Sequence, residues 1–136
     1  MLEFTLSQRN IFVGGEDLII ITIAMDIPQD KTKELLQAML VIKERMRIET
    51  GCIECDFLKD VEDENRYRLV GKWQREDDLN KHLQSEAFSV VLGAMSLLQK
   101  QAEIRLDVVA STKGIEAIHK ARDAQKSNTG RGLDKS

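Results

Sequence analysis

Trp73 and His82 are the two side chains whose chemistry best suits a small-molecule site. The imidazole of histidine titrates near neutral pH, so His82 can act as a base that takes a proton from a ligand. The indole ring of Trp73 can stack on a planar ligand. The competing interpretation is that Trp73 is a core residue and that His82 has a structural role on a helix. The sequence leaves both interpretations open.

Cys52 and Cys55 form a Cys-x-x-Cys pattern, which in other contexts marks a redox pair or a metal site. A redox pair works at the N-terminus of a helix, where the helix dipole lowers the pKa of the thiol. Here both cysteines enter a predicted strand, in which residues three apart point to opposite faces. A zinc site would need two more ligands, and the chain has only 2 histidines. We therefore predict two partly buried free thiols and no metal.

Hydrophobic patterning predicts the elements that position these side chains. Apolar positions four, three and four residues apart predict a helix over 31–49, and a second helical pattern covers 76–99 with a break near Ser85. Alternating or β-branched apolar residues predict four strands, at residues 17–27, 52–59, 66–74 and 102–111. The resulting order, β-α-β-β-α-β, predicts a ferredoxin-like α+β fold whose antiparallel sheet is covered by helices on one face.

The same patterns predict which side chains face the interior. The first helix presents one apolar stripe, and the second, third and fourth strands each alternate between an inner and an outer face. The predicted inward residues are Leu35, Met39, Ile42 and Met46; Ile53, Cys55 and Phe57; Tyr67, Leu69, Gly71 and Trp73; Leu79, His82 and Leu83; Phe88, Val91, Leu92, Met95 and Leu98; and Ile104, Leu106, Val108 and Ala110.

The chain of 136 residues has room for one such domain, which we place at residues 17–111. Residues 1–16, which end at Gly14 and Gly15, are interpreted as an N-terminal arm. Residues 112–136 form a polar C-terminal tail, with a short amphipathic piece followed from Ser127 by a stretch expected to be disordered.

Charge and composition exclude several classes of partner. The net charge is −3, and no run of Lys or Arg exceeds two residues, so a nucleic-acid partner is not expected. No apolar run approaches the roughly 20 residues that a membrane span needs, and the N-terminal residues lack a signal-peptide pattern. With 42% hydrophobic and 32% charged residues, the composition is typical of a globular protein, which we expect in the cytoplasm.

The first predicted strand indicates an oligomer. Residues 18–23 are apolar at both odd and even positions except for Thr22. Successive residues of a strand point to opposite faces, so both faces of this strand require burial. Two helices can cover only one face of a four-stranded sheet. A homodimer that packs sheet against sheet would cover the other face.

The residues between about 17 and 111 resemble the antibiotic biosynthesis monooxygenase (ABM) family. The resemblance rests on Glu49-Thr50-Gly51-Cys52 after the first helix, Trp73 at the end of the third strand, His82, and the run Ser85-Glu86-Ala87-Phe88. It implies a dimeric α+β barrel built from ferredoxin-like protomers. The family pattern has a Glu where this chain has Gly71, and commonly a Tyr where it has Cys55, so two polar groups of the family pocket are absent.

The resemblance also implies a function. It points to a cofactor-independent monooxygenase that oxidises a small quinol or aromatic substrate with O₂, in a pocket between the sheet and the helices. His82 and Trp73 are then the candidate catalytic residues, and Phe57, Tyr67 and Phe88 the candidate lining residues. Two alternatives remain: a dimer that binds a small metabolite without turnover, and a non-oxidative isomerase.

Haem is not expected as a cofactor. The haem-degrading members of the family use a histidine a few residues after the Phe of the second helix, and this position corresponds to Leu92. They also use an Asn in the first strand, and residues 18–25 contain none. The resemblance therefore implies a protein without haem, and the cofactor-independent reaction that it implies needs no flavin or metal.

Overall fold

The computed structural model describes residues 18–135 of the chain, with side chains through Lys126. The predicted N-terminal arm, residues 1–16, lies outside the described residues. Four strands form one antiparallel sheet in the order β2-β3-β1-β4. Their bounds are Leu18–Asp26 for β1, Cys52–Lys59 for β2, Arg66–Trp73 for β3 and Glu103–Val109 for β4. Two strands that are adjacent in sequence, β2 and β3, form a hairpin, while β1 lies between β3 and β4.

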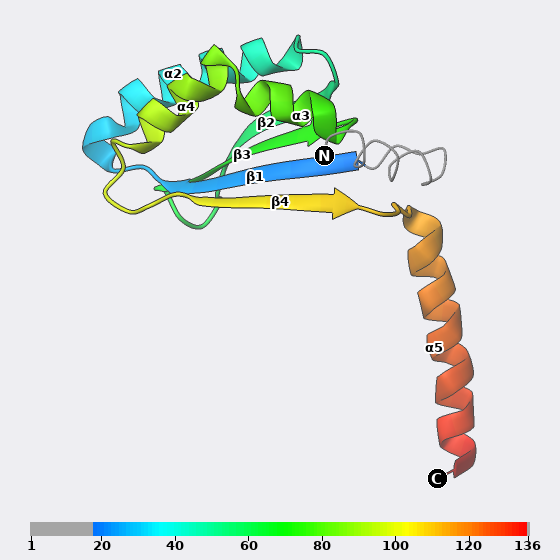
Figure 1. The fold of residues 1–136 in the computed structure, drawn as a ribbon. Helices are drawn as coiled ribbons and strands as arrows, with labels where there is room; N and C mark the ends of the chain where they lie inside the picture. The colour runs from blue at the N-terminus through cyan, green and yellow to red at the C-terminus, as the bar shows by residue number, and fades with distance from the viewer. Residues whose placement is uncertain (1–17, 136) are drawn as a thin grey trace.

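The helices α2 (Thr32–Arg47), α3 (Glu76–Leu83) and α4 (Glu86–Met95) lie together on one side of the sheet (Figure 1). A 3₁₀ turn, η2 (Gln29–Lys31), leads into α2. The order β-α-β-β-α-β and the single helical layer confirm the predicted ferredoxin-like α+β fold. The second helical segment is divided in two by Ser85, whose side-chain oxygen accepts a hydrogen bond from the backbone N–H of Phe88 at 3.2 Å.

The core lies between the sheet and the three helices. The predicted stripe of α2 is fully buried, and β1 and β3 bury alternate residues against it. The members with at most 5% exposure are Leu35, Met39, Ile42 and Met46 of α2; Ile19, Ile21, Ile23 and Met25 of β1; and Tyr67, Leu69 and Trp73 of β3. Each large apolar side chain buried in this way contributes roughly 1.5–3 kcal/mol to folding. The α2–β2 turn, the end of β3 and the start of α3 all border this core.

The fourth strand differs from the prediction. Ile104, Leu106 and Val108 pair with β1 residues that face the helices, as the alternation predicts, yet they are 50%, 52% and 68% exposed. The reason is that β4 is an edge strand on the side of the sheet that the helices do not cover (Figure 1). Ala110 lies beyond the end of the strand and is exposed. Their predicted burial is therefore wrong for the single chain.

Two further predictions of burial are wrong. The pairing of β2 with β3 shifts register between Cys52 and Glu54, and the intervening Ile53 is 57% exposed. A bulge of this kind leaves one residue out of the ladder and turns its side chain away. On α4, Leu92 is 49% exposed, because its neighbours Phe88 and Val91 define the buried face.

The C-terminal segment is helical where the sequence analysis expected a disordered end. Helix α5 spans Ile115–Lys135 and extends away from the sheet and the other helices (Figure 1). The residues of its first half are mostly good helix formers, and once a helix has begun, each further residue adds one hydrogen bond at low cost. Ile115 and Ile118 near its start are 63% and 55% exposed.

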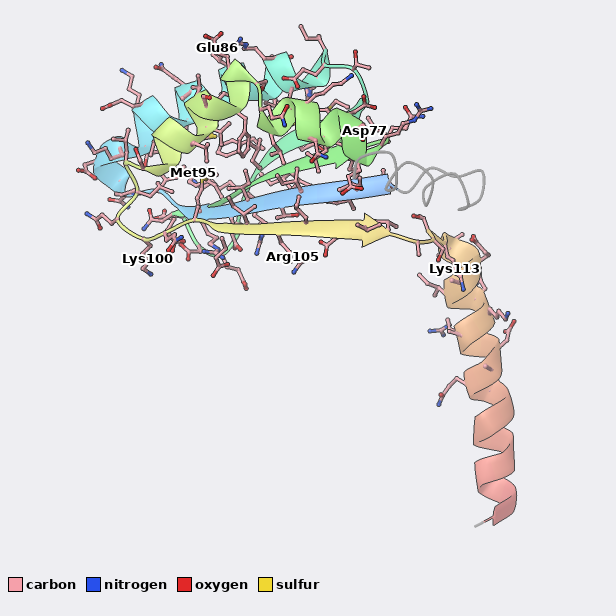
Figure 2. The ribbon with its side chains drawn as sticks, in the orientation of Figure 1. Asp77, Glu86, Met95, Lys100, Arg105 and Lys113 are labelled. Carbon is pink, nitrogen blue, oxygen red and sulfur yellow. The ribbon has the colours of Figure 1, made fainter. Side chains whose placement is uncertain are left out.

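The sheet face opposite the helices carries both apolar and charged side chains. Leu18, Ile20 and Val70 are half-buried there without any helix over them. Arg66 donates to Asp26 at 3.2 Å and to Glu103 at 3.1 Å. Figure 2 shows Arg105 of β4 directed to this side, away from the helices. We refer to this surface, formed by Leu18, Ile20, Thr22, Val70, Val109 and the charged residues beside them, as the open face.

Candidate functional site

The structure brings Trp73 and His82 into direct contact. Trp73 ends β3, between Ile19 of β1 and Cys52 of β2, and its side chain is 0% exposed. His82 lies in the last turn of α3 and is 1% exposed. The two rings stack with their centroids 4.8 Å apart and their planes at 24°. Phe88 completes the cluster, since its ring meets the imidazole edge-on at a centroid distance of 5.4 Å.

A third residue, Glu49, contacts the imidazole through its carboxylate. It was not among the site residues predicted from the sequence. Nδ1 of His82 lies 2.9 Å from Oε1 of Glu49, in the turn between α2 and β2. An ionised carboxylate only accepts hydrogen bonds, so this contact is a hydrogen bond to such a carboxylate when Nδ1 carries the proton. The sequence signal for Glu49 is its place in the Glu-Thr-Gly-Cys turn, but its contact with α3 depends on the tertiary fold.

Two ring nitrogens of this cluster have no hydrogen-bond partner. Nε1 of Trp73 and Nε2 of His82 are both buried and unpaired. A buried polar group without a partner costs about 1–3 kcal/mol, so such groups call for an explanation such as a ligand or a water molecule. The indole N–H is a donor, and Nε2 is an acceptor when Nδ1 carries the proton. A hydroxyl group both donates and accepts, and therefore matches this pair in chemical type.

Gly51 fixes the turn that carries Glu49. Its φ is 87°, and its carbonyl accepts from the backbone N–H of Gln74 at 2.8 Å. The side chain of Asp78 on α3 occupies the position that a Cβ on Gly51 would take. The turn and α3 therefore pack closely here, and this places Glu49 beside His82.

Replacing Gly51 with Ala is expected to lower the free energy of unfolding by about 2 kcal/mol, because the positive φ is strained for alanine and the new methyl group displaces Asp78. Urea denaturation measures the change. Gly93→Ala on α4 is the matched control, since a Cβ there meets nothing within 4 Å, and it should stabilise the protein by roughly 0.5–1 kcal/mol. Equal stability of Gly51→Ala and the wild type would contradict the proposed packing.

Phe57 and Tyr67 form a separate aromatic pair. Their rings stack with centroids 5.4 Å apart and planes at 7°. Tyr67 lies six residues from Trp73 along β3, which corresponds to about 20 Å of strand. Of the five residues predicted for the site, the structure therefore brings Trp73, His82 and Phe88 together and places Phe57 and Tyr67 elsewhere along the sheet.

The two cysteines are free thiols. Cys52 pairs with Trp73 and Cys55 with Gly71, two β3 residues that face the helices, so both cysteines lie on the helix-facing side. The prediction that they point to opposite faces is wrong because of the bulge at Ile53. Burial is the main cause that raises the pKa of both thiols, and it raises the pKa of Cys55 to about 12.

Thiol labelling at pH 8 should be slow at Cys52 and negligible at Cys55. The thiolate is the reactive species, and a pKa of about 12 leaves about one Cys55 thiol in 10⁴ ionised at that pH. A disulfide reagent that releases a coloured thiolate measures the reaction by absorbance. In urea, where the protein is unfolded, both cysteines should react. Cys52→Ser should abolish the slow phase. Rapid labelling of native Cys52→Ser would contradict this result.

Two hollows near the sheet lie away from the aromatic cluster. One hollow of about 350 Å³ on the open face is lined by Thr22, Ala24, Arg66, Arg68, Glu103, Ile104 and Arg105. Another, of about 210 Å³, lies between the β2–β3 turn and the segment before β4, and includes Asp26, Asp63 and Lys100. Neither is lined by Trp73 or His82. Among the residues whose side chains are described, no group of three or more His, Cys, Asp or Glu could hold a metal ion.

The family model for antibiotic biosynthesis monooxygenases matches residues 18–92, which is more than half of the chain. The chain belongs to this family. No protein of curated function matches it by sequence. Across the part of the chain that the structure describes, no helix has the length and apolar character to cross a membrane.

Several solved structures share the fold. A conserved protein of Methanosarcina mazei is 21% identical, with a TM-score of 0.65 over 68% of this chain and 93% of its own. A candidate antibiotic biosynthesis monooxygenase of Deinococcus radiodurans is 16% identical, with a TM-score of 0.67 over 71% of this chain and 97% of its own. A similarly named candidate from Nitrosomonas europaea is 15% identical, with a TM-score of 0.64 over 71% and 94%. At these identities, the likeness shows a shared fold.

Proposed function

We propose that this chain is a homodimeric, cofactor-independent monooxygenase that oxidises a small quinol or other hydroxylated aromatic compound with O₂. His82 is the base that takes the proton of the substrate hydroxyl, and Trp73 stacks on the substrate ring. Phe88 borders the same site. The observation that supports this proposal most strongly is the stacked Trp73–His82 pair, with one unpaired nitrogen on each ring.

The chemistry needs only groups that this cluster holds. Removal of the hydroxyl proton by Nε2 of His82 makes the ring electron-rich enough to transfer electrons to O₂. One oxygen atom of O₂ then replaces the hydrogen on a ring carbon and remains as the C=O of a quinone. The other oxygen leaves as water, with the hydrogens of the substrate O–H and C–H bonds. The proton on His82 is released into this water, and the base is regenerated.

The enclosed position of the cluster suits a reactive intermediate. Trp73 and His82 are 0% and 1% exposed, so a substrate can reach them only when α3 or α4 shifts outward. Both helices are short, with 8 and 10 residues. Exclusion of water around a deprotonated, electron-rich ring prevents its reprotonation by solvent.

The open face supports the proposed homodimer. Apolar residues of β1 and β3 are only half-buried there, and all three helices that pack on the sheet lie on the other side. A second copy related by a twofold axis would cover Leu18, Ile20 and Val70 with the same residues of its own sheet. The substrate site of each protomer remains between its sheet and its helices.

A binding protein without turnover is the second candidate. Gly71 favours it, because a glycine at this position contributes no polar side chain beside Trp73: a Cβ there would lie 3.1 Å from Nε1 of the indole. In this case, the cluster would hold a hydroxylated metabolite without activating it for O₂.

Oxygen consumption distinguishes the two functions. The full-length protein is incubated with a panel of dihydroxyaromatic compounds while an electrode records O₂ uptake, and isothermal calorimetry measures binding under argon. Uptake above the uncatalysed rate, with formation of a quinone that carries one more oxygen atom than the substrate, supports the monooxygenase. Binding without uptake supports the binding protein and contradicts the monooxygenase.

A further inference from the structure

Glu49 has a position that a purely structural surface carboxylate would not need. Its side chain is 26% exposed in the turn after α2, but Oε1 reaches inward to the ring of His82, which is 1% exposed. The contact joins two segments that are 33 residues apart in the chain, at 2.9 Å. It therefore couples the α2–β2 turn to the only buried polar residue of the described core.

The opposite side of the imidazole determines what this contact does. Nε2 of His82 is buried and has no partner, while Nδ1 faces the carboxylate. A neutral imidazole carries its proton on one nitrogen and a lone pair on the other. The carboxylate can accept only from a protonated Nδ1, so it selects the tautomer whose lone pair is on Nε2.

The contacts around His82 hold its backbone and limit how the ring can turn. The carbonyl of His82 accepts from the backbone N–H of Ser85 at 2.9 Å and from its hydroxyl at 2.6 Å. Trp73 stacks on the ring, and Phe88 meets it edge-on. These contacts fix the plane of the imidazole, but an aromatic neighbour does not distinguish one nitrogen from the other. Glu49 is the one described polar side chain bonded to the ring, and so the one that can make this distinction.

We propose that Glu49 is a positioning residue that keeps the proton of His82 on Nδ1 and so leaves Nε2 as an acceptor for a substrate hydroxyl. The role toward a substrate rests on the proposed function, whereas the location of the proton does not. The same geometric logic operates where a buried carboxylate orients a catalytic histidine, and there the wrong tautomer lowers kcat strongly.

Nitrogen NMR tests the location of the proton without any substrate. The chain has only 2 histidines, and the other, His119, is exposed on α5, so His119→Gln leaves His82 as the single imidazole. In this background, ¹⁵N spectra at pH 8.5 should show a protonated Nδ1 and an unprotonated Nε2. Glu49→Ala should raise the population with the proton on Nε2, and Glu49→Gln should give a mixture, because an amide can both accept and donate.

Glu44→Ala is the matched control. Glu44 lies on α2, five residues before Glu49, and is 64% exposed, and its contacts are with Lys43 and Arg47. Its removal changes the net charge by the same amount but should leave the tautomer of His82 unchanged. A wild-type spectrum with the proton on Nε2 or on both nitrogens would overturn the proposal. So would an unchanged tautomer in Glu49→Ala.

Kinetics with a substrate found by O₂ uptake adds the second readout. Glu49→Gln should lower kcat by roughly 10-fold or more, because the amide neither fixes the tautomer nor stabilises the imidazolium that forms when Nε2 takes the proton. It should change KM by less than about 2-fold, because the ring stack that binds the substrate stays in place. A change in KM alone would contradict the positioning role. If the tautomer is as expected but no substrate consumes O₂, the monooxygenase proposal fails, while the assignment of the proton by Glu49 stands.

Discussion

His82→Ala is expected to reduce the turnover of an established quinol substrate by roughly 100-fold or more. This is the usual size of the contribution of a general base. The loss should appear in kcat, because the variant removes the group that takes the substrate proton and leaves the indole of Trp73 in place. Steady-state O₂ uptake measures the change.

A smaller replacement in the core can also destabilise the protein, so a second variant separates the two effects. The amide nitrogen of asparagine occupies nearly the place of Nδ1, so His82→Asn can keep the hydrogen bond to Glu49 while removing the base at Nε2. It should fold with a melting temperature near that of the wild type and be as inactive as His82→Ala. Full activity of folded His82→Asn would show that His82 is structural, as the competing interpretation from the sequence holds.

Trp73→Phe is the contrasting variant in the same series. A phenyl ring still stacks, but with less area and without the indole N–H. Stacking stabilises the bound substrate and the transition state alike, so this variant should mainly raise KM. An equal loss in kcat for Trp73→Phe and His82→Ala would indicate that both changes disrupt the fold of the site.

Most of the fold could be predicted because local pattern and tertiary environment agree. The stripe Leu35, Met39, Ile42 and Met46 has helical spacing, and every member is buried. Ser85 breaks the second helical segment because its side chain caps a new helix. In such places, the period of the apolar residues and the capping chemistry contain the structural information in the sequence itself.

The failures occur where one residue depends on a distant segment. The alternation of β4 correctly gives the direction of Leu106, but it cannot show that the helices stop short of this strand. Alternation along β2 assumes an unbroken ladder, and the bulge at Ile53 places Cys52 and Cys55 on the same side.

The candidate site shows the same limit. The residue types of Trp73 and His82 were sufficient to select them. Trp73 is the one tryptophan of the chain, and His82 is one of its 2 histidines. The partner of His82 could not be found in this way, since Glu49 is 33 residues distant and approaches only when the α2–β2 turn packs on α3.

Val70→Lys on the open face is expected to convert the protein from a dimer to a monomer. Val70 lies on β3, opposite Thr22 of β1, near the middle of this face. In the proposed dimer, two lysines would lie close together near a twofold axis, and Asp56, the carboxylate opposite Val70, already pairs with Arg47. The cost of burying an unpaired charge is several kcal/mol, which exceeds what a small sheet interface can offset.

Light scattering at micromolar concentration measures the change directly. The wild type should have twice the 15.5 kDa mass of one chain, and Val70→Lys should have the mass of one chain. Val41→Lys is the matched control, because Val41 is 59% exposed on α2, on the helical layer away from the open face, and the same substitution there should leave the dimer intact. A wild type with the mass of one chain would contradict the dimer. A dimeric Val70→Lys would place the contact elsewhere, and the exposed row of Ile104, Leu106 and Val108 on β4 would then be the next surface to test.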